Sequence, residues 1–523
     1  MSLQHSGNLE QRSVVSSFIF SAAYENIQVA LFRRSDQVHT YRHRLAPISG
    51  SIDNNESPVA AAWREIEEET ALTPRELKLW RQGKPFSYSD PDIGREWVIH
   101  PFAFQLKSLK RKEPEFQINW EHDGWEWHDP GSIRDGEQLG GVPRLAESLR
   151  RVWFEVAMNQ EAGRTLHSAL EQLRSDHHSG SHELTSIALK EFRDVLAALQ
   201  GDENWWNTAR MAAWHLWKNG RESMGAATLN AILGVLADIE ALQVRNLDFQ
   251  SRWNGVIDVV DQHLKQRRAM PSQIKTTFAN YLQRNFQSDS LTQSPDTLTI
   301  LTLSASSTIR DSILDTFASL PLSRLDLRIL ESRPLFEGAS MASSIFSEWE
   351  TKHLSSFNKE LHLTVYTDAS AALASSNVDF VLLGADRISS SGSISNKTGS
   401  LPAVLTAKYI SPKAKILIFS QLEKVSAPGT EDDDRPEQNE RVEIMSGWFD
   451  ADVKGLNVLV EAIEGRQPEN SNYRVDAKNV YFEWVPADLI DAYISQDGTL
   501  DKAKILGKAQ HVQQQTQRYF DSL

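Results

Sequence analysis

The stretch GSIDNNESPVAAAWREIEEETAL, Gly50–Leu72, predicts a helix with one apolar and one acidic face. Pro58 and the carboxylate of Glu56 suit a helix N-terminus. At about 100° per residue, the apolar face comprises Val59, Ala62, Trp63 and Ile66. The acidic face has i, i+3, i+4 spacing and comprises Glu65, Glu68 and Glu69.

The acidic face has two interpretations. It is either an ordinary solvated helix surface or a site for a divalent cation. Three carboxylates on one face repel one another, which destabilises the helix unless cations compensate. Mg²⁺ or Mn²⁺ would do so, because hard cations prefer oxygen ligands and retain water that can attack a phosphate. The spacing of the acidic run from Gly50, Glu56 and Arg64 favours the metal site.

These residues resemble the Nudix box. That family's pattern is Gly, five residues, Glu, seven residues, Arg-Glu-aliphatic, any residue, Glu-Glu, any residue, Gly-aliphatic. Gly50, Glu56 and the run Arg64–Glu69 match it, whereas the last Gly of the pattern is Ala71 here. The resemblance implies a Nudix α/β/α sandwich for this part of the chain.

The resemblance also implies roles for individual residues. Glu65, Glu68 and Glu69 become metal ligands, and Glu65 and Glu68 are also counted as catalytic. Arg64 becomes the group that orients Glu65, and it is counted with the catalytic set. Gly50 and Glu56 become structural residues of the box.

A further acid usually lies on a later strand or loop in this family. Glu121, in NWEHDGWEW, is our candidate for a metal ligand or general base, with Asp123 as second choice. The other interpretation of Glu121 is an exposed loop acid.

The reaction implied by the resemblance is hydrolysis of a nucleoside diphosphate linked to another moiety, of the ADP-ribose or nucleotide-sugar class. The box itself does not specify the substrate. Trp97, Phe102 and Trp125 are candidates for stacking on a base, but aromatic residues at strand spacing are also typical of a core.

Hydropathy patterns divide the chain into three predicted parts. Residues 1–145 contain β-rich runs interrupted by one helix, which indicates an α+β module. Residues 146–286 show helical periodicity, and we expect this helical segment to form one unit with residues 287–523. Residues 287–523 alternate apolar strands with helices, which predicts a doubly wound, Rossmann-like parallel sheet. Its predicted strands are TLTILTLS, LDLRILES, LHLTVYT, VDFVLLGA, AKILIFS and NVYFEWV.

Composition excludes several classes of protein. The 523 residues carry a formal charge of −15, which argues against nonspecific binding to a nucleic-acid backbone. The absence of cysteine excludes disulfides, thiolate nucleophiles and zinc–thiolate sites. We find no signal peptide and no uninterrupted run of about 18 apolar residues, so we expect no transmembrane helix and a cytoplasmic location.

The last part resembles the translation initiation factor 2B alpha/beta/delta family, which includes methylthioribose-1-phosphate and ribose-1,5-bisphosphate isomerases. The matching pieces are ILTLSASSTIRDSI, ESRPLFEGASMA, GADRISSSGSISNKTGS and VPADLIDAYISQDG, between about Thr297 and Gly498. The preceding helical segment matches the family's N-terminal part, weakly, at Gly220-Arg221 and Asn230.

This second resemblance implies a sugar-phosphate site. Asp386 matches the isomerases' acid, and Asn396 with Lys397 matches their substrate-binding pair. Ser304 stands where the isomerases have a catalytic cysteine, so we expect binding of a sugar phosphate or nucleotide rather than isomerisation. Further candidates for phosphate binding are Ser304, Ser306 and Ser307, where a strand leads into a helix N-terminus, and Arg221.

We therefore predict a Nudix hydrolase joined to a regulatory domain that binds a sugar phosphate. The alternative is a non-catalytic regulatory or scaffold protein of the initiation-factor type that contacts translation factors, and a working isomerase is a third interpretation. The second resemblance also implies a homodimer formed through the last domain.

Overall fold

The computed structural model describes residues 9–21, 27–107, 116–136, 138–155, 157–176, 179–221, 225–243, 248–286, 296–351, 359–429, 439–451, 453–465 and 472–523. The chain forms two compact units. Unit 1 comprises Met1–Gly225, Leu236–Val260 and Arg518–Leu523, and unit 2 comprises Ala226–Val235 and Asp261–Gln517. The acidic, breaker-rich stretch that the sequence predicts as a surface insertion, 426–439, lies largely outside the described residues.

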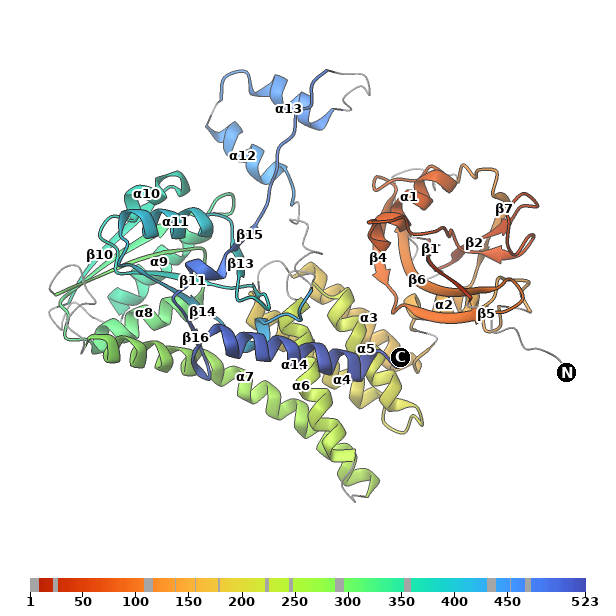
Figure 1. Ribbon diagram of the computed structural model, residues 1–523, viewed down its shortest axis with the longest axis horizontal. Coiled ribbons are helices and arrows are strands. Elements are labelled where there is room, and N and C mark those ends of the chain that lie inside the picture. Colours follow the sequence, from red (N-terminus) through yellow and green to blue (C-terminus); the bar gives the residue numbers. More distant parts are fainter. Residues whose placement is uncertain are drawn as a thin grey trace. The chain divides into compact units, whose positions relative to one another are not determined.

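Unit 1 is built around a seven-stranded mixed sheet (Figure 1). Its strands are β1 (Glu10–Phe20), β2 (Val29–Arg34), β3 (Leu45–Ala46), β4 (Leu77–Gln82), β5 (Phe86–Asp90), β6 (Arg95–Leu106) and β7 (His122–His128). The order is β3-β2-β1-β6-β4, with β5 paired to β6 and β7 paired to β2. β1 and β6 run parallel along the whole of β1.

Helices α1 (Pro58–Thr70) and α2 (Leu145–Val152) cover opposite faces of this sheet. Alternate residues of β1 explain why both faces are apolar. Val15 and Ile19 pack in the cluster that contains α1, whereas Phe18 and Phe20 pack in the cluster that contains α2. The predicted α/β/α sandwich is confirmed.

The helical segment contains α3 (Gln160–Ser175), α4 (Ser181–Ala198), α5 (Trp205–Asn219), α6 (Gly225–Gln243) and α7 (Phe249–Phe286). Helices α3–α5 belong to the same compact unit as the first sheet. The buried Arg81 of β4 connects the sheet to these helices. Its guanidinium donates hydrogen bonds to both oxygens of Glu155 (2.6 and 2.8 Å) and lies 2.7 Å from Nδ1 of His167 on α3. Asn219 of α5 adds a second connection, because its side chain makes two hydrogen bonds with the backbone of Gln82 on β4.

By length and composition alone, α6 could cross a membrane, and it is the one such helix among the described residues. Its side chains at Ile232, Val235, Leu236 and Ile239 are fully buried in the protein. A core helix of a packed protein satisfies the same criterion.

Unit 2 contains a second seven-stranded sheet, in the order β10-β9-β8-β11-β14-β16-β17. The strands are β8 (Thr297–Leu303), β9 (Arg324–Leu330), β10 (Glu360–Tyr366), β11 (Phe380–Gly384), β14 (Lys415–Phe419), β16 (Ala492–Ser495) and β17 (Gly498–Leu500). All neighbours are parallel except β16 and β17. The predicted doubly wound fold is confirmed.

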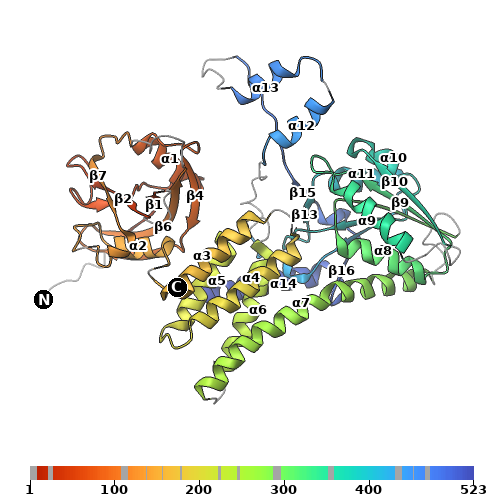
Figure 2. The ribbon, with the colours of Figure 1, turned by 180° about the vertical axis from the view of Figure 1, so that it is seen from behind.

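Helices cover both faces of this sheet, as Figures 1 and 2 show. Helices α8 (Ser307–Ser319) and α9 (Glu337–Thr351) pack with the end of α7 in one core cluster. Helices α10 (Ala371–Ala374), α11 (Ser400–Ile410) and α14 (Lys502–Phe520) pack in the other. Helices α12 (Val442–Asp450) and α13 (Leu456–Glu464) share a small core of their own around Met445 and Ile463.

One predicted strand of the parallel sheet was wrong. NVYFEWV contributes β15 (Phe482–Val485), which instead joins β12 (Arg387–Ile388) and β13 (Ile394–Lys397) in a three-stranded antiparallel sheet. Glu483 explains the difference, because its carboxylate accepts hydrogen bonds from Gly399 N and Leu401 N at the start of α11. The central sheet takes β16 in its place.

Candidate functional site

Helix α1 presents the predicted acidic face. Ser57 caps its N-terminus by accepting a hydrogen bond from Ala60 N, and Pro58 occupies the first turn. The helix ends at Ala71, which adopts the left-handed conformation with φ of 57°. That is the position at which the Nudix box has Gly, the residue that tolerates this conformation best. On the apolar face, Ala62 and Ile66 are buried, whereas Val59 is 37% exposed.

Arg64 organises the carboxylates around it. Its Nε and Nη2 donate to the two oxygens of Glu56 at 3.0 and 2.9 Å, which is a bidentate pair. Its Nη1 donates to Glu65 at 2.7 Å and contacts Glu68 at 3.4 Å. Arg64 therefore holds Glu65 as predicted, and it also fixes the structural acid Glu56 and touches Glu68.

Gly50 lies directly against Glu65. A Cβ atom at residue 50 would stand 1.9 Å from Cδ of Glu65, which no side chain can tolerate. Gly50 O accepts a hydrogen bond from Val15 N at 2.9 Å, so the loop is anchored to β1. The glycine of the box is thus required by the close approach of the Glu65 carboxylate.

Glu69 is buried and paired with a residue that the sequence did not single out. Its Oε2 lies 2.5 Å from Nε2 of His122, at the start of β7. Burial raises the pKa of Glu69, as do the charges of Glu121 and Glu65. Burial lowers the pKa of His122 to about 4, and the charge of Arg34 acts in the same direction. Both groups are therefore driven toward their neutral forms.

Glu121 lies beside these carboxylates, whereas Asp123 does not. The charge of Glu121 raises the pKa of both Glu65 and Glu69. Asp123 is half-exposed and faces His43 at 3.9 Å. The charges of Glu68 and Glu121 both act on Glu65, and those of Glu121 and Glu65 act on Glu69, so these carboxylates interact electrostatically.

Arg34, at the end of β2, is a further cation near the carboxylates. Its Nε donates to Thr40 O at 3.1 Å. Burial lowers the pKa of Arg34, against the opposing charges of Glu69 and Glu121. The sequence carries no spacing signal for this residue, because β2 and α1 meet only in the folded chain.

The chemistry of this group fits a hard divalent cation. All of the predicted ligands are carboxylates, and Oε1 of Glu69 is buried with no hydrogen-bond partner among the described residues. Mutual repulsion and an unpaired buried oxygen are both relieved by a cation. In the described part of the chain, no three His, Asp or Glu side chains converge closely enough to hold a metal ion. The contacts of Glu65 and Glu68 with Arg64 explain this, since these carboxylates point to the guanidinium.

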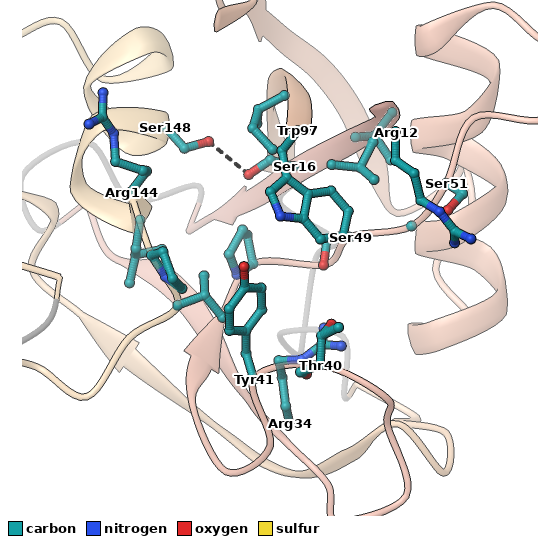
Figure 3. Close-up of a pocket in the computed structure, with 18 of the residues that line it drawn as sticks. Arg12, Ser16, Arg34, Thr40, Tyr41, Ser49, Ser51, Trp97, Arg144 and Ser148 are labelled. Carbon is teal, nitrogen blue, oxygen red and sulfur yellow. Dashed lines mark hydrogen bonds between the residues drawn. The ribbon is translucent and has the colours of Figure 1, made fainter. Parts of the chain in front are cut away.

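A pocket of about 540 Å³ adjoins the group (Figure 3). Gly50 and Glu121 line it at the carboxylate end. The remaining wall is aromatic and cationic, with Tyr41, Phe86, Tyr88, Trp97, Trp120, Arg12, Arg34, Arg95 and Arg144. This size is within the usual range for a small-molecule site. Of the aromatic candidates from the sequence, Trp97 lines the pocket, whereas Phe102 and Trp125 pack in or against the core on the α1 side of the sheet.

In unit 2 the predicted serines lie where β8 leads into α8, and two of them already make hydrogen bonds there. Ser304 comes directly after β8 with φ of 63°, and its N–H donates to Ser332 Oγ at 2.7 Å. Ser306 caps α8 by accepting from Ile309 N. Ser307 is exposed at the first turn of α8. The helix N-terminus is thus capped by its own side chain.

Asp386, Asn396 and Lys397 lie at one end of the unit 2 sheet, after β11 and on β13. Lys397 is 4% exposed and its Nζ donates to Glu337 at the start of α9 (2.5 Å). Asn396 donates to Ser400 Oγ at 2.9 Å. The cation expected to meet a phosphate is therefore paired with a carboxylate.

Lys424 is a further cation near Asp386 that the sequence did not single out. Its Nζ donates to Ala385 O at 2.5 Å. Burial lowers the pKa of Lys424, against the opposing charge of Asp386. Arg221, the remaining phosphate candidate, belongs to unit 1, where it donates to Asp176 O at 2.7 Å.

Two family models match the chain. The Initiation factor 2 subunit family matches residues 226–502, which is more than half of the chain. The NUDIX domain matches residues 10–152 and indicates a hydrolase. Both resemblances expected from the sequence are confirmed.

Curated relatives match only part of the chain. The methylthioribose-1-phosphate isomerase of Pseudomonas paraeruginosa is 25% identical over 174 residues, which covers 33% of this chain and 40% of that protein. The isomerase of the same name from Rhodopirellula baltica is 27% identical over 180 residues, covering 34% and 43%. The chain thus spans about two fifths of the length of these relatives.

Among solved structures, the translation initiation factor eIF-2B of Pyrococcus horikoshii matches with a TM-score of 0.44 and 18% identity, covering 64% of this chain and 96% of that one. The tetrameric eIF2B-beta2-delta2 complex of C. thermophilum matches with a TM-score of 0.45 and 14% identity, covering 69% and 98%. Because its family model covers more than half of the sequence, the chain belongs to the Initiation factor 2 subunit family, and it carries a NUDIX domain at residues 10–152.

Proposed function

We propose that this chain is a Mg²⁺- or Mn²⁺-dependent hydrolase that cleaves a nucleoside diphosphate linked to another moiety, of the ADP-ribose or nucleotide-sugar class. The observation that carries the proposal is the group of four carboxylates at α1 and the loop before β7. It includes the buried Oε1 of Glu69, which has no hydrogen-bond partner among the described residues, and Glu121, which lines an aromatic and cationic pocket.

Each residue of the group has a defined part in this proposal. Glu65, Glu68 and Glu69 would hold the cation, and Arg64 contacts both Glu65 and Glu68 through its Nη1. When bound, a divalent cation neutralises bridging phosphates and lowers the pKa of a coordinated water. Glu121 would accept the proton of the attacking water. The guanidinium of Arg34 would bind a phosphate oxygen at the carboxylate end of the pocket.

The experiment compares nucleotide release by three proteins. The wild type is expected to release AMP from ADP-ribose with Mg²⁺ and not with EDTA. Glu68→Gln should lower kcat by about a hundredfold or more, because it removes a ligand carboxylate. Glu67→Gln is the matched control, since Glu67 is exposed on the same helix as Glu68 but is not one of the predicted ligands. Equal turnover by wild type and Glu68→Gln would refute the assignment.

For the second domain we propose binding of a sugar phosphate or nucleotide. Hydrolysis of ADP-ribose yields a sugar phosphate and AMP, so the second domain would bind a product of the first. The names of the curated relatives support a sugar-phosphate ligand. Ser304 at the position of the isomerases' cysteine argues against isomerisation, since no activating base is assigned to it. Consumption of ribose 1,5-bisphosphate that is lost in Asp386→Asn would establish the isomerase alternative instead.

We also propose that the chain forms a homodimer through the second domain. Leu373, Leu405 and Tyr409 expose 72%, 49% and 87% of their surface on α10 and α11, which pack on each other. Exposed apolar residues gathered in this way are typical of an interface. Light scattering should give a dimer mass for the wild type and a monomer mass for Tyr409→Lys. A wild-type monomer, with translation factors recovered by pull-down and no nucleotide hydrolysis, would favour the scaffold alternative.

A further inference from the structure

The floor of the unit 1 pocket is a sheet face on which side chains form rows across three strands. Residues of one row are register partners on β1, β6 and β5, and alternate residues of each strand point to this face. One row is Arg12, Trp97 and Tyr88, and the next is Val14, Ile99 and Phe86. All six line the pocket. The pocket therefore has an apolar, aromatic floor bordered by a cation.

Three arginines of the lining lie beside or on this floor. Arg34 lines the pocket with Glu121, and the charges of Glu69 and Glu121 act on it. Arg12 is the register partner of Trp97, and Arg95 lies two residues before Trp97 on β6. The guanidinium of Arg95 is 5.3 Å from the Trp97 ring. In the view of Figure 3, the Trp97 ring lies between Arg12 and Tyr41.

Arg12 and Arg95 share one partner. Arg12 Nη2 lies 3.0 Å from one oxygen of Glu10, and Arg95 Nε lies 3.7 Å from the other. Two guanidinium groups and one carboxylate leave a net positive charge. The side chain of Glu10 is 58% exposed, so its ion pairs contribute little to stability and a stronger anion can displace them. Their common contact also shows that one small anion can reach both arginines.

The pocket has more positive charge than a diphosphate uses. Its lining contains four arginines and a single acid, Glu121, among the described residues. A bound metal and Arg34 would neutralise the scissile diphosphate of the proposed substrate. Arg12 and Arg95 are not needed for that step, and they border the aromatic floor, which suits a base.

We infer that Arg12 and Arg95 form an anion subsite, and that the substrate carries a phosphate monoester in addition to the scissile diphosphate. The inference rests on the proposed function and deepens it, because it names a class: a nucleoside diphosphate derivative phosphorylated on its ribose. Phosphate matches the paired guanidinium groups through charge-assisted hydrogen bonds. A cavity of about 540 Å³ has room for such a ligand.

The test compares ADP-ribose with its 2′-phosphate. The wild type should hydrolyse the phosphorylated compound with a kcat/KM at least about tenfold higher, mostly through KM. Arg12→Gln and Arg95→Gln should abolish this preference, bringing kcat/KM for the phosphorylated compound down to that for ADP-ribose in the same variant. Arg33→Gln is the matched control, since Arg33 is paired with Glu126 outside the pocket lining. Glu10→Gln should strengthen the preference by removing the competing carboxylate.

A binding measurement separates failure of the inference from failure of the proposed function. Calorimetry in EDTA compares adenosine 2′,5′-bisphosphate with AMP and needs no hydrolysis. Tighter binding of the bisphosphate that is lost in Arg12→Gln supports the subsite, even if no nucleotide is hydrolysed. Hydrolysis of ADP-ribose with no preference for the 2′-phosphate, and equal binding of the two nucleotides, overturns the subsite and leaves the proposed function intact.

Discussion

Ala71 is the one departure from the Nudix pattern, and its backbone conformation is expected to lower the stability of the protein. The residue ends α1 with φ of 57°, a conformation that strains any residue with a Cβ. The N–H of Ala71 still donates to Glu67 O at 2.9 Å, so the turn itself is retained. The substitution therefore affects stability at the end of the helix rather than the carboxylate positions.

Ala71→Gly is expected to raise the free energy of unfolding by about 1 kcal/mol, because glycine adopts the left-handed conformation without strain. Urea unfolding followed by tryptophan fluorescence measures the change. Ala60→Gly, in the first turn of the same helix, is the control and should lower stability by a similar amount. A loss of stability in Ala71→Gly would contradict the role given to this turn.

Sequence spacing predicted the residues of one helix well and their partners poorly. The positions of Glu65, Glu68 and Glu69 on α1 result from helical periodicity, and those of Gly50 and Glu56 from a local motif. The contacts of Glu69 with His122 and of Lys397 with Glu337 join residues 53 and 60 positions apart. Such pairs depend on how strands are ordered in a sheet, which no local pattern contains.

At the scale of elements, strands of the first sheet have a weaker sequence pattern than those of the second. β4, LKLWRQ, and β5, FSYSD, contain charged and polar residues because β4 carries the buried Arg81 and β5 borders a pocket. The strands of the second sheet are almost continuously apolar because helices cover both faces, and five of the six predicted ones lie in it. β4 and β5 thus lack the continuous apolar run that identifies the strands of the second sheet.

The buried His215 on α5 leads us to expect that the stability of the protein depends on pH. His215 is fully buried, and its Nδ1 accepts from Asn219 Nδ2 at 2.9 Å. Burial lowers the pKa of His215 well below 6.5, and the charges of Arg81, Arg151 and Arg174 act in the same direction. The unfolded chain therefore binds a proton at His215 more strongly than the folded chain does. The contribution of this residue to the free energy of unfolding is fully present above the unfolded pKa and is lost as the pH falls below about 6.5.

The expected loss from this residue is at most about 1.4 kcal/mol per pH unit. Urea midpoints of wild type and His215→Gln, measured between about pH 7.5 and pH 5.5, provide the test. The variant should show a shallower decline, because His215 no longer titrates. Identical slopes would mean that the other histidines account for the dependence.

The ion pair between Lys397 on β13 and Glu337 on α9 leads to a prediction about ligand binding by the second domain. Lys397 is the cation that a sugar phosphate would need, and it is paired with Glu337. Glu337→Gln should therefore tighten binding of ribose 5-phosphate by about tenfold, whereas Lys397→Met should abolish it. Calorimetry measures both, with the exposed Lys415→Met as control. Unchanged affinity in Glu337→Gln would place the phosphate elsewhere.

At the scale of the whole molecule, the chain joins a hydrolase fold to a fold whose curated relatives act on a sugar phosphate. The boundary between the compact units does not coincide with the predicted domain boundaries, because Arg81 and Asn219 join α3–α5 to the first sheet. The sequence patterns identified both folds, but side-chain contacts decided the grouping of the helices.

The proposed function depends most on one step, the attack of water on a phosphorus atom of a diphosphate in the Mg²⁺ form of unit 1. Hydrolysis of ADP-ribose in ¹⁸O-water, with the products analysed by mass spectrometry, follows that step itself. We expect AMP and ribose 5-phosphate in equal amounts, one ¹⁸O in one of the two phosphates, and loss of both products in Glu68→Gln. No AMP from any nucleotide with Mg²⁺ or Mn²⁺, or unlabelled products, would show that unit 1 does not catalyse this reaction.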